Sequence, residues 1–511
     1  MPAEEGSGMQ ELFTGIRMAR GAFKLVLFAI PVVLLYLTVT APTYIWVYYL
    51  SPPAVRAHPP QTWQQLLAVV HPYEWVLWTV LALWNALLIT LVVAFRRWKR
   101  RGGFRAPSVA ARNVSHGSAK WGSGRPLMQP TGRIIGRKSG RLLRYSGHGH
   151  LVTLAPARSG KGVSAVIPNL LDHPGSVVVT DIKGENYAVT AMRRARDVGH
   201  QVHALDPFNA AGGRACYNPL DILDPYSPHA VDDAAMIADM LVAPAEGGGA
   251  AGEGFWDDEA RALLAGVVMH AAQLPEPGRR TLPHVRELLT GTPEELAQLW
   301  AAMLAAGGPQ ALFIRRAAAR VLQKADRERS GVVSSAQRHT HFLDSTAMTL
   351  TLAHSSVDLA DLVRGRLSLY LVLPPDYLDT HHRWLRLMIA CSLRAVTRAA
   401  ARPAERVLFV LDEFANLGTM APLVRAASLL PGYGLSLWLF LQDLAKLRAV
   451  YKDAWGTFLA NADVLQVFGT NDLFTAEYVS KMTGQTTVAV ESANWSDGRN
   501  SRDLHVLGGS Q

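Results

Sequence analysis

Cysteine is scarce in this sequence: only Cys216 and Cys391 occur among 511 residues. They lie far apart and belong to no Cys-x-x-Cys or Cys/His cluster, which argues against a disulfide framework and against a zinc site. A chain of this composition fits a reducing compartment.

Charged residues are also few, at 18%, whereas hydrophobic residues make up 49%. This balance allows a sizeable core and membrane segments. The length indicates two or three structural units rather than one. The formal net charge of +10 is compatible with nucleic acid or anionic lipid, and net charge alone does not choose between them.

Two long stretches carry no charge at all: 26 residues from Leu25 to Leu50 and 21 residues from Trp75 to Phe95. Each exceeds the roughly 20 residues that cross a bilayer as a helix, so we expect two transmembrane helices. A signal peptide is the alternative, but the first stretch is too long and no small-residue cleavage site precedes the loop.

Basic residues flank these two stretches. The first stretch is preceded by Arg17, Arg20 and Lys24. The second is followed by Arg96, Arg97, Lys99, Arg100 and Arg101. The connecting loop 51–74 contains a single arginine, Arg56. The positive-inside rule places both termini in the cytoplasm and the loop outside. We therefore expect a multi-pass protein of the bacterial inner membrane with a large cytoplasmic part.

The rest of the chain alternates between strand and helix patterns. Apolar, β-branched runs at 150–154, 176–180, 201–205, 367–373, 406–411, 435–441 and 463–468 are typical of buried parallel strands. Between 231 and 354 only helical patterns occur. The fold class that we expect is α/β: a RecA-like P-loop NTPase domain with an inserted all-α domain, preceded by two N-terminal transmembrane helices.

The corresponding domain boundaries are an anchor at 1–101, a linker at 102–140, the nucleotide-binding domain at 141–230 and 355–490, the all-α insertion at 231–354, and a polar, Gly/Ser-containing tail at 491–511. The tail is expected to be flexible.

A glycine-bearing loop joins the strand at 150–154 to the next helix. It reads Ala155, Pro156, Ala157, Arg158, Ser159, Gly160, Lys161, Gly162 and Val163. In a P-loop, Gly-x-x-x-x-Gly-Lys-Ser/Thr, backbone N–H groups surround phosphate oxygens and the lysine reaches the terminal phosphates. Here Ala155 replaces the first glycine and Gly162 replaces the Ser/Thr, so a basic glycine turn is the alternative interpretation.

A second motif favours the nucleotide interpretation. The apolar run Val407–Leu411 ends in Asp412 and Glu413, which is the Walker B pattern. Asp412 is predicted to hold Mg²⁺, and Glu413 is predicted to act as general base for the attacking water. Gln442 follows the apolar run 435–441 at the same edge of the predicted sheet, where it could sense the terminal phosphate of ATP or serve only as a capping amide.

These residues resemble the type IV secretion coupling proteins, the TraG/VirD-type family. The strings that carry the resemblance are 117–121 (GSAKW), 158–163 (RSGKGV), 175–186 (GSVVVTDIKGEN), 217–220 (YNPL), 411–418 (LDEFANLG) and 432–434 (GYG). The resemblance implies an ATP-dependent, homo-hexameric motor that receives relaxase-bound single-stranded DNA or effector proteins and delivers them to a type IV secretion channel. It also implies that the insertion 231–354 recognises the cargo.

The resemblance further leads us to expect a subunit-bridging arginine just before Gly432, where Leu430 and Pro431 stand instead. Arg425 is the candidate, with a solvated helix-face charge as the alternative. Asp181, Lys183 and Glu185 are expected either to support the nucleotide site or to form a turn.

Two other functions remain open at this stage. One is a docking platform for protein effectors that uses ATP only for assembly. The other is a DNA pump of the FtsK/HerA kind, against which the GSAKW and DEFANLG strings argue.

Overall fold

The computed structural model describes residues 124–242, 253–483, 485–496 and 499–510, together with a few isolated positions before residue 124. The chain divides into two units, Met1–Ser115 and His116–Gln511. Among the described residues no helix is both long and apolar enough to cross a membrane. The stretches 25–50 and 75–95 lie almost entirely outside these residues, so the membrane anchor stays a prediction.

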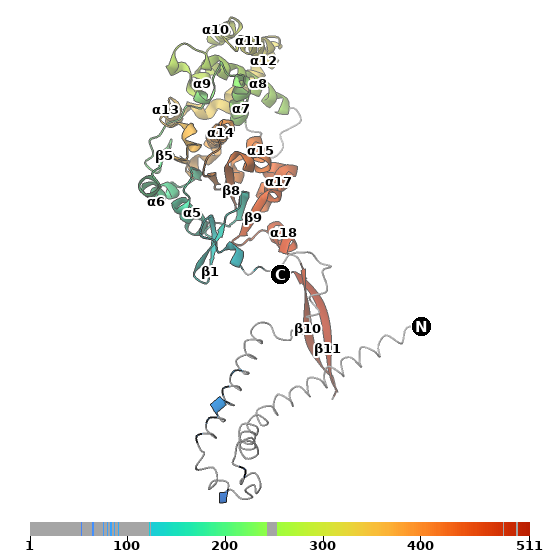
Figure 1. Cartoon of the computed structure of the whole chain (residues 1–511). Coiled ribbons are helices and arrows are strands. Elements are labelled where there is room, and N and C mark those ends of the chain that lie inside the picture. Colours follow the sequence, from blue (N-terminus) through green and yellow to red (C-terminus); the bar gives the residue numbers. More distant parts are fainter. Residues whose placement is uncertain are drawn as a thin grey trace. The chain divides into compact units, whose positions relative to one another are not determined.

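The second unit is built on a sheet of seven parallel strands in the order β5-β6-β4-β7-β8-β3-β9 (Figure 1). The strands are β3 (His150–Leu154), β4 (Val177–Asp181), β5 (Gln201–Leu205), β6 (Leu367–Val372), β7 (Val407–Leu411), β8 (Leu435–Leu441) and β9 (Ala462–Val467). The expected parallel α/β architecture is confirmed, and β3, β5 and β8 have the predicted bounds.

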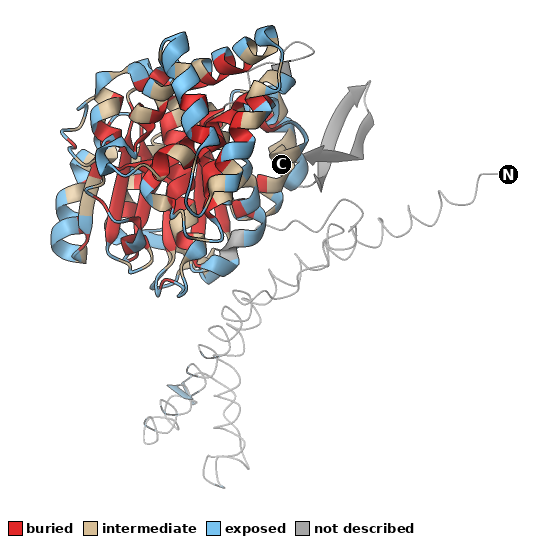
Figure 2. Cartoon of the chain, turned by 90° about the horizontal axis from the view of Figure 1, so that it is seen from above, coloured by how far each residue is buried: buried red, intermediate tan, exposed pale blue. Residues whose placement is uncertain are grey.

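Both faces of the central strands are buried, because successive side chains of a strand point to opposite faces of the sheet. In β7, Phe409 and Leu411 pack with one cluster of buried residues, whereas Leu408 and Val410 pack with another. Figure 2 shows the buried strands between helices whose outer surfaces are exposed. This two-sided burial explains why the strands read as unbroken apolar runs.

Helices cover both faces of the sheet. One face carries η5 (Gly162–Val166), α5 (Ile167–Asp172), α6 (Glu185–Arg193) and η6 (Arg194–Val198). The other carries α14 (Pro375–Arg398), α15 (Ala421–Leu429), α16 (Leu444–Tyr451) and α17 (Trp455–Ala460). Helix α18 (Leu473–Thr483) follows β9 and packs against α16.

Between β5 and β6 the described chain forms helices only. They are α7 (Ala230–Leu241), α8 (Glu253–Ala272), α9 (Leu282–Thr290), α10 (Pro293–Leu304), α11 (Ala311–Leu322), α12 (Asp326–Thr340) and α13 (Thr346–Leu352), with short η7 (Pro219–Ile222), η8 (Pro277–Arg279), η9 (His341–Asp344) and η10 (Leu359–Leu362). Helix α8 packs against α7, α11 and α12. In Figure 1 this helical region lies at the end of the unit away from β1.

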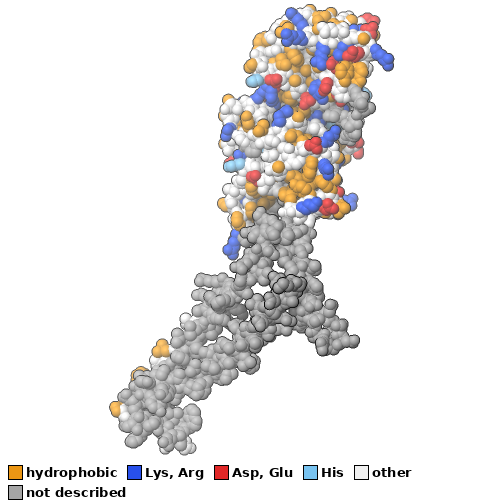
Figure 3. All heavy atoms as spheres, turned by 90° about the vertical axis from the view of Figure 1, so that its right-hand side faces the viewer, with side chains coloured by type: hydrophobic (Ala, Val, Ile, Leu, Met, Phe, Trp, Pro, Cys, Tyr) orange, Lys and Arg blue, Asp and Glu red, His pale blue; other side chains and the backbone are white. Residues whose placement is uncertain are grey.

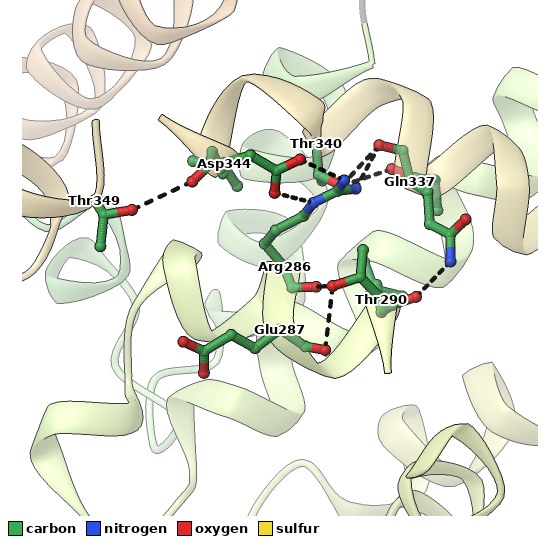
Figure 4. Close-up of polar contacts among 10 residues, drawn as sticks. Arg286, Glu287, Thr290, Gln337, Thr340, Asp344 and Thr349 are labelled. Atoms are coloured by element: carbon green, nitrogen blue, oxygen red, sulfur yellow. Dashed lines mark hydrogen bonds and ion pairs between the residues drawn. The ribbon is translucent and has the colours of Figure 1, made fainter. Parts of the chain in front are cut away.

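Arg286 of α9 holds part of this helical region together (Figure 4). Its Nε and Nη2 atoms each donate to Asp344 at 2.8 Å, and its Nη1 donates to the Gln337 carbonyl at 2.7 Å and to Thr340 Oγ1 at 3.1 Å. The Arg286 hydrogen bonds lower the pKa of Asp344. One guanidinium thus fixes α9 against the end of α12 and against η9.

Two antiparallel ribbons occur where no regular structure was expected. Strands β1 (Arg133–Lys138) and β2 (Arg141–Tyr145) pair within and beyond the range 102–140 that was assigned to a linker. The two residues between them, Ser139 and Gly140, both have positive φ, at 50° and 81°. That geometry suits the tight turn of a two-residue hairpin.

The second ribbon occupies most of the range 491–511 that was expected to be a flexible tail. Strands β10 (Gln485–Ser496) and β11 (Arg499–Ser510) pair in register from end to end. The two residues between them in the sequence are Asp497 and Gly498, a dipeptide typical of two-residue hairpin connections. The polar composition of residues 491–511 favoured a flexible tail over the hairpin that this dipeptide indicates.

Arg194 differs from its neighbours Arg193 and Arg196, which are exposed. Its side chain is fully buried. It donates to the carbonyl oxygens of Leu170, His173 and Gly175, and its Nε donates to Ser368 Oγ at 2.6 Å. The carbonyls at the end of α5 attract the cation, and composition alone does not reveal them.

Candidate nucleotide-binding site

Three neighbouring strands end together at the carboxyl edge of the sheet. Strand β8 lies between β3, which precedes the glycine loop, and β7, which precedes the acidic pair. The backbone N–H of Ala155 donates to the Leu441 carbonyl at 2.8 Å and extends the β3–β8 pairing by one residue. Ligands of open parallel sheets bind at this edge.

The loop 155–161 turns sharply over the end of β3. Arg158 and Gly160 have positive φ, at 62° and 83°. Left-handed residues alternating with right-handed ones turn successive backbone N–H groups toward one side, which is the arrangement of an anion nest. The hydroxyl of Ser159 is buried and has no hydrogen-bond partner in the described structure.

Lys161 lies between the two predicted acids. Its Nζ donates to Asp412 Oδ1 at 2.6 Å and to Glu413 Oε1 at 2.7 Å. Burial opposes the charged form of this lysine, but the charges and hydrogen bonds of Asp412 and Glu413 outweigh burial and raise the pKa of Lys161. The ammonium group is therefore charged at neutral pH and balances one of the two carboxylates.

Glu413 connects the acidic pair to β8. Its Oε2 accepts from Gln442 Nε2 at 3.0 Å, while its backbone N–H donates to Asp412 Oδ1 at 3.0 Å. Its φ of 53° is unusual for a residue with a Cβ atom, and such strain occurs at sites whose surroundings hold the backbone in place. Lys161, Asp412, Glu413 and Gln442 thus form one hydrogen-bonded group.

Thr180 was not singled out from the sequence. Its hydroxyl accepts from the Asp412 N–H at 2.6 Å and donates to the Asp412 carbonyl at 3.1 Å. Strand β4 pairs with β7, so the penultimate residue of β4 adjoins the first residue after β7. This contact depends on strand order, which the linear sequence does not give.

Other sequence candidates lie apart from this group. Arg425 is exposed on α15 and lines a cavity with residues of α7 and α14, including Asp239 and Arg398. Asp181 is buried and accepts from the Tyr187 N–H at 2.8 Å, which is the turn-forming alternative for this residue.

The residues present fit a magnesium nucleotide. The unpartnered Ser159 hydroxyl, the turned loop and the Lys161 ammonium offer donors for phosphate oxygens. A Cβ atom at Gly162 would meet no atom within 4 Å, so the surroundings of Gly162 are open. Asp412 offers the carboxylate oxygen that Mg²⁺ prefers.

The parallel sheet and the residues at its carboxyl edge define a RecA-like nucleotide-binding domain. The chain belongs to the family described as type IV secretory system conjugative DNA transfer, whose profile matches residues 119–504. The resemblance to TraG/VirD-type coupling proteins is thereby confirmed.

Curated relatives agree with this assignment. The conjugal transfer protein TraG of Escherichia coli is 30% identical over 436 residues, which cover 77% of this chain and 68% of TraG. Protein VirD4 of Agrobacterium fabrum is 29% identical over 411 residues, which cover 75% of this chain and 59% of VirD4.

Solved structures of the bacterial conjugative coupling protein TrwB share the fold. The unbound form is 18% identical with a TM-score of 0.54, over 76% of this chain and 83% of that chain. The complex with ADP and Mg²⁺ is 16% identical with a TM-score of 0.55, over 76% of this chain and 86% of that chain.

The role of Thr180 in positioning Asp412 can be tested by mutation. We expect Thr180→Val to lower kcat for ATP hydrolysis about tenfold and to leave KM for ATP nearly unchanged, because the lost hydrogen bonds fix Asp412 rather than bind nucleotide. Thr180→Ser should restore most of the rate. Steady-state kinetics of the three proteins measures this, and equal kcat values for all of them would contradict the role.

Proposed function

We propose that this chain is the ATP-hydrolysing coupling protein of a type IV secretion or conjugation system. The observation that carries the proposal is the convergence of Lys161, Asp412, Glu413 and Gln442 from three adjacent strands on one hydrogen-bonded group. A lysine for phosphate, an acid for metal and a second acid for water are the components that phosphoryl transfer to water requires.

Each residue has a distinct part in this proposal. The loop 155–163 wraps the phosphates with backbone N–H groups, and Lys161 neutralises their negative charge. Glu413 accepts a proton from the attacking water, and Gln442 holds the Glu413 carboxylate through its 3.0 Å hydrogen bond. Asp412 would hold Mg²⁺, which would neutralise charge on the phosphate oxygens.

Buried arginines offer a route from this site to the helical region. Arg386 of α14 donates to the Leu417 and Thr419 carbonyls at 3.0 and 2.8 Å, and its Nε donates to the Met240 carbonyl at 3.3 Å. It therefore joins the loop after Glu413 to the end of α7. Burial lowers the pKa of Arg386 to about 10, which leaves it charged at neutral pH. A shift in the position of Asp412 and Glu413 can thus be transmitted to α7 through the Arg386 side chain.

A second set of contacts strengthens the same connection. Asp233 of α7 is fully buried and forms ion pairs with Arg394 and Arg398 of α14. These ion pairs hold α7 against α14. We propose that the two helices move together and transmit the nucleotide state to the cargo-binding helices.

The proposed cargo is relaxase-bound single-stranded DNA or effector proteins, delivered to the secretion channel by a membrane-anchored homo-hexamer. The family description, conjugative DNA transfer, supports DNA as the cargo, and the relative TraG is a conjugal transfer protein. On the described part of the face in Figure 3, Lys and Arg side chains are interspersed with Asp and Glu. Arg425, exposed on α15, is the arginine proposed to reach a neighbouring subunit's nucleotide.

Lys161→Ala tests the motor directly. We expect DNA transfer between cells to fall at least about 100-fold, because one preorganised charge at a phosphoryl-transfer site has that order of effect on the rate. A mating assay that counts transconjugants measures it. The control is Lys481→Ala, an exposed lysine whose one ion pair is 4.0 Å long. Normal transfer by Lys161→Ala would overturn the motor function.

Gly162 gives a second test, because its surroundings have room for a side chain. Gly162→Ser restores the hydroxyl of the P-loop pattern, and we expect it to lower the Mg²⁺ concentration for half-maximal ATPase activity several-fold. Gly162→Ala is the matched control that adds the Cβ atom without the hydroxyl. A magnesium titration of the two variants that gives superimposable curves would rule out metal binding beside residue 162.

A further inference from the structure

A second cavity, of about 700 Å³, lies at the opposite edge of the sheet, where β3, β7 and β8 begin. Its lining includes four arginines: Arg133, Arg144, Arg402 and Arg406. The nucleotide-site residues follow the carboxyl ends of the same strands and do not line this cavity.

Arg133 is the most deeply placed of these arginines. Its residue is only 7% exposed, it forms no ion pair with a described residue, and its Nε has no hydrogen-bond partner there. Its Nη2 donates to the Gly147 carbonyl at 2.6 Å, and its guanidinium lies 5.2 Å from the centre of the Tyr145 ring. A buried charge of this kind is costly unless an anion balances it.

Two other buried arginines show how the fold satisfies a guanidinium when no ligand is needed. Arg194 donates to three carbonyl oxygens, a hydroxyl and the His200 ring. Arg386 donates to three carbonyl oxygens. Arg133 differs from both because it retains an unpaired donor and lines a cavity.

The acids near Arg133 offset its charge only in part: Asp463 favours the charged form, and Glu405 and Asp172 are the acids of the cavity lining. Asp172 is already paired with Arg144, at 2.5 and 3.0 Å. Burial lowers the pKa of Arg133, and the nearby Arg406 charge lowers it further; burial lowers the pKa of Arg406 as well, with Arg402 contributing. The arginines therefore repel one another, and an anion between them would relieve that repulsion.

His173, beside the cavity, is uncharged at neutral pH. Burial, followed by the Arg194 charge, lowers the pKa of His173 to about 4, and its Nε2 donates to the Arg406 carbonyl at 2.9 Å. His148 Nδ1 accepts from Arg406 Nε at 3.1 Å. The positive potential of the cavity comes from guanidinium groups and persists at neutral pH.

We propose that this cavity binds a phosphate group, carried either by an anionic phospholipid headgroup or by a free phosphate compound. Several guanidinium forks facing one space match the oxygens of phosphate. The lining also includes Gly132, Gly147, Gly432 and Gly434, where the absence of side chains lets a ligand approach the backbone. Pro130, Thr131 and Gly132 of the lining come between the second predicted membrane span and β1 in the sequence, which favours a lipid headgroup as the source.

The test uses the full-length chain in detergent micelles, with Lys161→Ala in every protein so that the P-loop lysine does not bind the probe. Inorganic phosphate is titrated by calorimetry. Arg133→Gln should weaken phosphate binding at least about tenfold, the effect of losing a charged hydrogen-bonding partner. Arg402→Gln, at an exposed residue of the lining, should weaken it less and remains informative if Arg133→Gln does not fold.

Arg137→Gln is the matched control, since Arg137 is exposed on the same strand and is absent from the cavity lining. Phosphate affinities of Arg133→Gln and Arg402→Gln equal to that of the control would overturn the proposal. Repeating the titration with phosphatidylglycerol or phosphatidylcholine added to the micelles separates the sources. Weaker phosphate binding with phosphatidylglycerol alone identifies the lipid headgroup, and equal binding in both identifies a free phosphate compound.

Discussion

The pairing of Lys161 with Asp412 and Glu413 is the contact on which the site depends. One ammonium group lies 2.6 and 2.7 Å from two carboxylates, so one negative charge is left unbalanced and a metal ion is the natural complement. This arrangement requires β8 between β3 and β7, and it requires the parallel sheet that brings all three carboxyl ends to one edge. The strand order of the sheet therefore holds Lys161 in contact with Asp412 and Glu413.

Buried cations recur throughout the second unit, and their partners decide what each one does. Carbonyl oxygens satisfy Arg194 and Arg386, so these residues fix helices and loops. Asp233 forms ion pairs with Arg394 and Arg398 and joins α7 to α14. Arg133 donates to the Gly147 carbonyl, but its Nε has no hydrogen-bond partner among the described residues, and this unpaired donor is what the proposed ligand would satisfy.

Much of the sheet could be predicted from the sequence, because buried parallel strands are continuous apolar runs and the loop and acidic pair follow two of them. The β1–β2 and β10–β11 ribbons were not predicted, because the dipeptides Ser139-Gly140 and Asp497-Gly498 that separate their strands are short signals in polar surroundings. Thr180 and Arg386 could not be found, because their partners are distant in sequence and depend on strand order and helix packing.

The central claim is that Glu413 activates water while other residues bind the nucleotide. The most direct measurement is single-turnover ATP hydrolysis by the purified full-length Glu413→Gln variant, together with its affinity for ATP. We predict that ATP binding stays within a few-fold of the unaltered protein while hydrolysis slows at least about 100-fold. Hydrolysis at the unaltered rate would contradict it.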